Sequence, residues 1–250
     1  MITIACYSNK GGVGKTATAV NLAYISANCG YTTLICDMDP QGASSYYFRV
    51  KPSKKLKKAA FFKDVERFLK SIRASDFDNL DIIPANMTFR NFDIFLDRMK
   101  KSRSRLKKAL QVVDNDYDII FLDCPPNISR LSENVFKNAD IILVPVIPTT
   151  LSERTLFQLE DFFKRHKYKS KRITPFFSMV QKSKKLHRET MRRLRKRDSR
   201  FLTSTIPFST HVERMGIYRT PVFQFAPSCS AVNAYTELWD ELEEKMKPMI

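Results

Sequence analysis

The chain has 250 residues, of which 43% are apolar, and its formal net charge is +17. This size and apolar content suffice for one core, so we expect residues 1–250 to form a single domain. No apolar run approaches the ~20 residues that span a bilayer and no signal peptide precedes the first strand, which argues against a membrane-spanning or secreted protein. The five cysteines lack metal-ligand spacing, so we expect reduced thiols in a cytoplasmic protein.

A glycine-rich loop follows the first predicted strand, residues 2–7, and precedes a predicted helix over 17–28. The loop holds Gly11, Gly12 and Gly14, half of the six glycines in the chain, whereas average composition would give about 17. Backbone N–H groups, the helix dipole and the ammonium group of Lys15 converge here, where they would bind the β and γ phosphates of a nucleotide. The hydroxyl of Thr16 would bind magnesium.

Carboxylates follow two further predicted strands. Asp37 and Asp39 come at the end of a strand over 32–37, and Asp123 ends a strand over 118–123. The carboxyl ends of parallel strands meet at one edge of the sheet, where open α/β sheets bind their ligands. A carboxylate there can hold magnesium or orient a water for attack on the γ-phosphate. The alternative is that these aspartates only cap the turns that follow.

The remaining sequence alternates apolar runs with helical periodicity. This alternation predicts an α/β fold with a doubly wound, mostly parallel sheet flanked by helices. The other expected strands are 80–84, 140–146, 173–180 and 201–206, and the other expected helices are 60–72, 89–113 with a break, 151–166, 183–197 and 230–247.

The segment from Lys10 to Thr16 resembles the deviant Walker A motif of the ParA/MinD family of ATPases, with Asn9 where the usual phosphate loop has glycine. The resemblance is specific up to residue 150 and architectural beyond it. It implies the deviant Walker A P-loop ATPase fold, with ATP and Mg2+ as cofactors. It also implies that the nucleotide is bound by Lys10, Gly11, Gly12, Val13, Gly14, Lys15, Thr16 and Ala17, with Pro207 and Ser209 as candidates for the adenine pocket.

The same resemblance implies individual roles. Lys10 would reach across an ATP-bound dimer to the phosphates on the other subunit. Asp37 and Asp39 are similar to the Walker A′ signature of the family, and Asp123 is similar to its Walker B signature. Asp39 would therefore position the attacking water, while Thr16, Asp37 and Asp123 would hold the magnesium.

Positive charge is concentrated in four segments. Residues 51–73, 98–108, 164–172 and 182–200 hold 32 of the 43 Lys and Arg residues but only four acids. This polarity is typical of a polyanion-binding face, although a basic helix can also be only a solvated surface. No base-reading motif accompanies it, so we expect sequence-independent binding to double-stranded DNA. The candidate contacts in segment 182–200, which holds the most Lys and Arg residues, are Lys182, Lys184, Lys185, Arg188, Arg192, Arg193, Arg195 and Arg197.

The motifs, the charge and the resemblance lead to one functional hypothesis. The protein would be a slow, partner-stimulated ATPase that forms a homodimer with ATP, binds DNA non-specifically and positions a cargo over the nucleoid. A ParB-like or other adaptor would sit on the cargo, which could be a plasmid, a chromosomal origin or a protein organelle such as a carboxysome.

Three alternatives remain open. A membrane-associated regulator like MinD would need a basic amphipathic terminal helix, but the helix over 230–247 is acidic, so we expect no membrane binding. A metabolic P-loop enzyme would need a shaped acceptor pocket. A metal-assembly ATPase, or one that carries a cluster, would need a second cysteine to support Cys124, and none stands at a suitable spacing.

Overall fold

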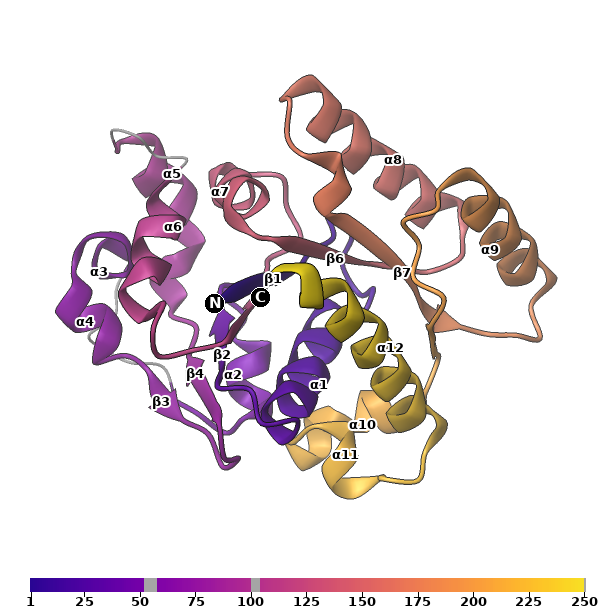
Figure 1. The fold of residues 1–250 in the computed structure, drawn as a ribbon, viewed down its shortest axis with the longest axis horizontal. Helices are drawn as coiled ribbons and strands as arrows, with labels where there is room; N and C mark the ends of the chain where they lie inside the picture. Colours follow the sequence, from indigo (N-terminus) through magenta and orange to yellow (C-terminus); the bar gives the residue numbers. More distant parts are fainter. Residues whose placement is uncertain (52–57, 100–103, 250) are drawn as a thin grey trace.

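The computed structural model describes residues 1–51, 58–99 and 104–249. In this part of the chain, strands form one eight-stranded sheet in the order β3-β4-β2-β5-β1-β6-β7-β8 (Figure 1). All neighbouring strands are parallel except β3 and β4, so the expected doubly wound α/β fold is confirmed. The strands are β1 (Ile2–Cys6), β2 (Thr33–Asp37), β3 (Arg73–Ala74), β4 (Leu80–Ile83), β5 (Ile119–Asp123), β6 (Ile141–Val146), β7 (Ile173–Val180) and β8 (Thr205–Pro207).

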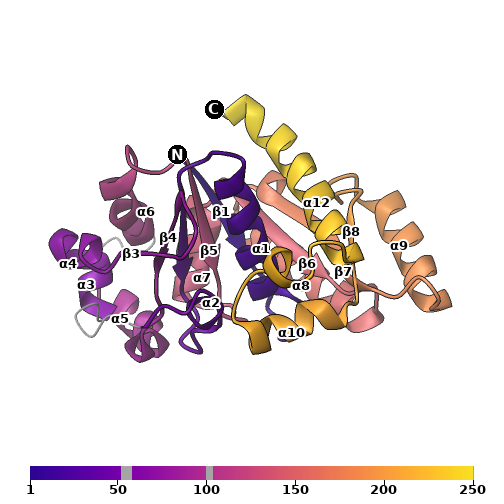
Figure 2. The same cartoon turned by 90° about the horizontal axis from the view of Figure 1, so that it is seen from below.

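Helices cover both faces of the sheet. One face carries α1, α10, α11 and α12, and the other carries α3 to α9 (Figures 1 and 2). The two termini lie near each other at the opposite end of the sheet from α2 and α10 (Figure 2). The helices are α1 (Lys15–Asn28), α2 (Ala43–Tyr47), α3 (Lys58–Lys63), α4 (Val65–Leu69), α5 (Phe92–Asp97), α6 (Arg105–Leu110), α7 (Arg130–Asn138), α8 (Thr150–Arg165), α9 (Lys185–Arg197), α10 (Thr210–Tyr218), α11 (Val222–Phe225) and α12 (Ser230–Met246).

The central strands are apolar on both faces. All five residues of β5 are buried, as are all five of β1, which is typical of parallel strands covered by helices on both sides. Successive side chains enter different layers: Ile4 and Cys6 pack in the cluster that includes α1 and α12, whereas Ala5 and Tyr7 pack in the cluster of the opposite face. The sheet thus holds its carboxyl edge between two rigid layers.

Two of the expected elements differ in the structure. The last strand begins later than expected: the sequence predicted residues 201–206, whereas β8 spans Thr205–Pro207. Phe201 and Leu202 are buried in the core before the strand begins, and their apolar side chains resembled the start of a strand. The helix expected over 60–72 is divided into α3 and α4, because Asp64 is extended and its side chain caps α4 by accepting from the N–H of Arg67. Residues 100–103 of the segment expected over 89–113 lie outside the described residues.

Several short elements escaped prediction altogether. These are α2, α7, α10, α11 and β3. The beginning of α7 carries a readable signal, because Ser129 and Ser132 form a reciprocal capping box. The other helices are at most nine residues long, too short for periodicity to distinguish them from loops.

Candidate nucleotide site and basic surface

The glycine-rich loop joins β1 to α1 at the carboxyl edge of the sheet. Gly14, directly before α1, has a φ of 92°, and Gly12 has a φ of 67°. L side chains rarely adopt these values, and a Cβ at Gly14 would lie 3.1 Å from Oγ of Ser178 on β7. Since no side chain caps α1, its first N–H groups can bind an anion.

Lys15 is the buried cation of the loop, with only 7% of its surface exposed. Its Nζ donates a hydrogen bond of 3.0 Å to the backbone oxygen of Lys10. Burial lowers the pKa of Lys15, whereas nearby acidic groups, chiefly Asp123, oppose this change. An ammonium group held at a helix N-terminus in this way suits phosphate oxygens.

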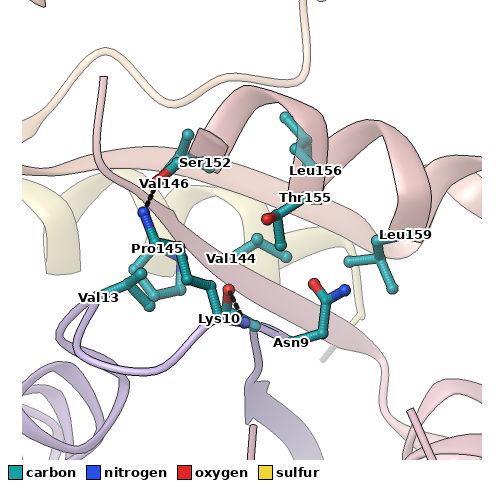
Figure 3. A pocket seen from close by; sticks show the side chains of 11 residues that line it. Asn9, Lys10, Val13, Val144, Pro145, Val146, Ser152, Thr155, Leu156 and Leu159 are labelled. Atoms are coloured by element: carbon teal, nitrogen blue, oxygen red, sulfur yellow. Dashed lines mark hydrogen bonds between the residues drawn. The ribbon is translucent and has the colours of Figure 1, made fainter. Parts of the chain in front are cut away.

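Lys10 lies against its own chain. Its Nζ donates a 3.0 Å hydrogen bond to Oγ of Ser152 in the first turn of α8 (Figure 3). The two residues border a small cavity of about 10 Å³, lined also by Asn9, Val13 and Pro145. The lysine that the family resemblance assigns to a partner subunit is therefore engaged within the monomer.

Asp37 and Asp123 are buried neighbours, because the parallel register pairs them directly across β2 and β5. In each carboxylate, Oδ2 accepts a hydrogen bond from a serine of α2, and Oδ1 is buried without a partner among the described residues. Burial and then the charge of Asp123 raise the pKa of Asp37 to about 8. Burial raises the pKa of Asp123 to about 6, against hydrogen bonds from Ser44 and Thr16. Two unpartnered oxygens of this type fit Mg2+.

Asp39 is less buried and partly committed to its own turn. Its Oδ1 accepts a 3.0 Å hydrogen bond from the N–H of Gln41, and its backbone oxygen accepts from Gly42. Turn capping is thus present at Asp39, but only at one oxygen of its carboxylate. No described residue donates a hydrogen bond to its Oδ2.

Of the two adenine candidates, only Pro207 lines a cavity beside β8. Pro207 lines this cavity of about 400 Å³, together with Thr205, Asn233 and Glu237. Ser209 is not among its lining residues and is instead the N-cap position of α10. Sequence reasoning missed Asn233 because it lies in α12, far along the chain from the strand end.

The basic segment 182–200 contains helix α9, as expected. His187, Thr190 and Leu194 bury one side of the helix, and the predicted arginines occupy the exposed side. The segments 51–73 and 98–108 each include residues outside the described part of the chain. The segments 164–172 and 182–200 are described in full, and the second holds the candidate contacts. We define the α9 surface as residues 182–197.

Five of the eight candidate DNA contacts interact with other groups of the same chain. Arg193 pairs with Glu153 of α8, Arg197 lies 3.6 Å from the ring centroid of Phe157, and Arg195 donates to the backbone oxygen of Thr203. Arg188 donates to the backbone oxygens of residues 182 and 183, and Lys185 lies 3.8 Å from Glu189. Of the eight candidates, Lys182, Lys184 and Arg192 have charged groups with no hydrogen-bond or ion-pair partner among the described residues.

The cysteines bear on the alternative of a cluster-carrying or metal-assembly ATPase. No group of three or more His, Cys, Asp or Glu side chains in them is arranged to hold a metal ion, and the five cysteines are free. Cys124, the candidate cluster ligand, is buried, and burial raises its pKa. Across the same residues, no helix combines the length and apolar character needed to cross a membrane.

The sheet order and the loop between β1 and α1 define the fold of the deviant Walker A P-loop ATPases. The family model for the AAA domain matches residues 1–174, and the chain belongs to that family. Its expected placement among the ParA/MinD proteins is confirmed by its similarity to Soj, ParA and a plasmid partition protein.

Curated relatives include chromosome-partitioning proteins. Soj, the sporulation initiation inhibitor protein of Bacillus subtilis, is 34% identical over 145 residues, which are 57% of this chain and 57% of Soj. ParA of Caulobacter vibrioides is 25% identical over 250 residues, which are 96% of this chain and 92% of ParA. The chain thus spans little more than half the length of Soj at the higher identity.

Solved structures share the fold over nearly the whole chain. A plasmid partition protein of Borrelia burgdorferi bound to AMPPNP has a TM-score of 0.79 and 23% identity, covering 98% of this chain and 99% of that one. Cobyrinic acid a,c-diamide synthase of Mycobacterium smegmatis, with ADP and magnesium, has a TM-score of 0.82 and 22% identity, covering 99% and 96%. At these identities the likeness shows the fold alone, and that fold serves both partition proteins and a metabolic enzyme.

Proposed function

We propose that this protein is a magnesium-dependent ATPase of the ParA type that forms an ATP-bound homodimer and binds DNA without sequence preference. The observation that carries the proposal is one edge of the sheet, where the uncapped start of α1, two lysines and the Asp37–Asp123 pair come together. Nucleotides in the neighbouring structures, AMPPNP in one and ADP with magnesium in another, agree with this assignment.

The phosphates would bind at the loop. Lys15 and the first N–H groups of α1 would hold the β and γ phosphates, as the positive end of a helix does for anions. Thr16, Asp37 and Asp123 would hold the magnesium, which neutralises charge on the phosphates when bound. Pro207 would border the adenine, with Asn233 beside it, because both line the cavity next to β8.

Hydrolysis would depend on Asp39 and Lys10. Asp39 has one carboxylate oxygen that no described residue occupies, so it can accept a hydrogen bond from a water and orient it for in-line attack. Lys10 would exchange Ser152 for a phosphate oxygen of the opposite subunit, since an ammonium gains more from a charged acceptor than from a hydroxyl.

DNA would bind along the α9 surface. Lys182, Lys184 and Arg192 are exposed and carry charges that no other described residue neutralises. Such groups favour phosphate contacts, which depend on charge and not on base sequence. Binding to the nucleoid, an adaptor and a cargo would follow from this activity, as the names of the partition relatives suggest.

A gel shift with unrelated double-stranded DNA fragments, with and without ATP, tests the proposal. We expect a shift that requires ATP and magnesium, is equal for all fragments and disappears as salt increases. A protein that hydrolyses ATP but binds no DNA would favour a metabolic enzyme on the same fold, of the kind that cobyrinic acid a,c-diamide synthase represents.

A further inference from the structure

Two consecutive serines face the buried carboxylates from α2. Ser44 and Ser45 are 0% and 3% exposed, although they belong to a helix of only five residues, Ala43–Tyr47. Gly42, with a φ of 69°, turns the chain into this helix just after Asp39. Both hydroxyls therefore lie directly behind the site proposed for magnesium.

The hydroxyl group of Ser45 both donates and accepts hydrogen bonds. Its Oγ donates a 2.6 Å hydrogen bond to Oδ2 of Asp37, and its backbone N–H donates to the same oxygen at 2.8 Å. The same Oγ accepts a hydrogen bond of 2.9 Å from the N–H of Ala85, which follows β4. The hydroxyl proton is thus committed to Asp37, and its acceptor side is committed to a neighbouring strand end.

Ser44 repeats half of this arrangement on the next carboxylate. Its Oγ donates a 2.6 Å hydrogen bond to Oδ2 of Asp123. The serine donors reach Oδ2 in both aspartates, and each Oδ1 is buried without a hydrogen-bond partner among the described residues. Burial and mutual repulsion disfavour the ionisation of both paired carboxylates, and a hydrated divalent cation is the ligand that would stabilise both charges and satisfy both oxygens.

We propose that Ser44 and Ser45 are positioning residues for the magnesium site, which hold Oδ2 of each aspartate and reserve Oδ1 for the cation or its water ligands. The inference rests on the proposed nucleotide site. Partners of this kind fix the orientation of metal-binding carboxylates, and their loss typically weakens metal binding by about 10- to 100-fold. A role in packing alone would change stability but not the requirement for magnesium.

The test is a titration of MgCl2 into protein with a fluorescent ATP analogue, repeated in EDTA. We expect Ser45→Ala to raise the half-saturating magnesium concentration by about tenfold and Ser44→Ala by a smaller factor, with binding in EDTA unchanged. Ser45→Thr keeps the hydroxyl and should restore most of the parent response. Ser71→Ala is the matched control, since Ser71 is a fully buried serine whose Oγ donates only to the backbone oxygen of Phe68.

Several results would overturn the inference. A folded Ser45→Ala variant with the magnesium requirement of the parent removes the positioning role and leaves the proposed nucleotide site intact. An equal loss of binding in EDTA and in magnesium assigns the serine to packing. A parent protein whose nucleotide binding does not depend on magnesium would refute the proposed magnesium site and the role of the serines with it, whereas a parent protein that binds no nucleotide would refute the proposed function itself.

Discussion

The carboxyl edge of the sheet around the glycine-rich loop, which we call the loop edge, and the α9 surface are both rich in charged residues. They differ in how those charges are neutralised. At the loop edge, Lys15, Asp37 and Asp123 are buried, and their surroundings leave specific atoms without partners. On α9 the charges are exposed, and about half of them are paired with α8 or with the backbone. If the proposed function holds, we expect the buried residues of the first region to be individually necessary and the second region to act as a sum of similar contacts.

The largest effect that would sharpen this contrast is expected at Asp39. Asp39→Ala should lower the rate of ATP hydrolysis by about 10²- to 10⁴-fold, the usual contribution of a group that handles the reacting water. ATP should still bind, because the phosphate-binding groups remain. Phosphate release measured beside nucleotide affinity separates the two, and hydrolysis at the parental rate would show that another residue orients the water.

Lys15→Ala should weaken ATP binding itself. A hydrogen bond to a charged group contributes about 1.5–3 kcal/mol, so we expect affinity to fall about 10- to 100-fold. Calorimetric titration with ATP and magnesium measures the change, with Lys137→Ala on α7 as a control lysine outside the site. Unchanged affinity would exclude the loop as the phosphate site.

The triple variant Lys182→Glu, Lys184→Glu and Arg192→Glu tests whether the unpaired charges carry DNA binding. Each lost phosphate contact should reduce the slope of log affinity against log salt by about 0.9, and affinity should fall equally for all sequences. Fluorescence anisotropy with two unrelated duplexes over a salt series measures both quantities. A variant that keeps the parental slope would move the DNA surface to another basic segment.

Arg200→Ala should produce the smallest effect, and on stability instead of binding. The half-buried guanidinium of Arg200 donates to Asp198 and to the backbone oxygen of Ser170, and it pairs with Glu160. Part of these contacts is screened by solvent, so we expect a loss of about 1 kcal/mol, or roughly 2–4 °C in Tm for a chain of this size. A matching loss of DNA affinity would show that paired and unpaired arginines act alike.

The sequence predicted the first of the two regions far better than the second. At the loop, residues 10–17 are consecutive, and a motif with a fixed spacing predicts their shared location. The pairing of Asp37 with Asp123 followed from the rule that parallel strands end at one edge. The contacts of Ser44, Ser45 and Asn233 depend on side-chain packing across the sheet, and no local pattern reports them.

On α9 the sequence predicted the helix but not which of its arginines pair with other groups of the protein. The sequence placed Arg193 and Arg197 among the candidate DNA contacts, yet Glu153 and Phe157 of α8, each 40 residues away, engage them. Contacts between helices that are remote in sequence decide which charges are free. The same limit explains β8, where core packing of Phe201 resembled a strand pattern.

The glycines of the loop also separate what the fold requires from what a ligand requires. Gly14 is constrained twice by the protein itself, through its positive φ and the nearby Ser178. Gly11 has no positive φ, and a Cβ there would meet nothing within 4 Å. The fold itself therefore accommodates an alanine at position 11. If Gly11→Ala weakens nucleotide binding without changing stability, that loss reports how closely the backbone must approach a bound phosphate.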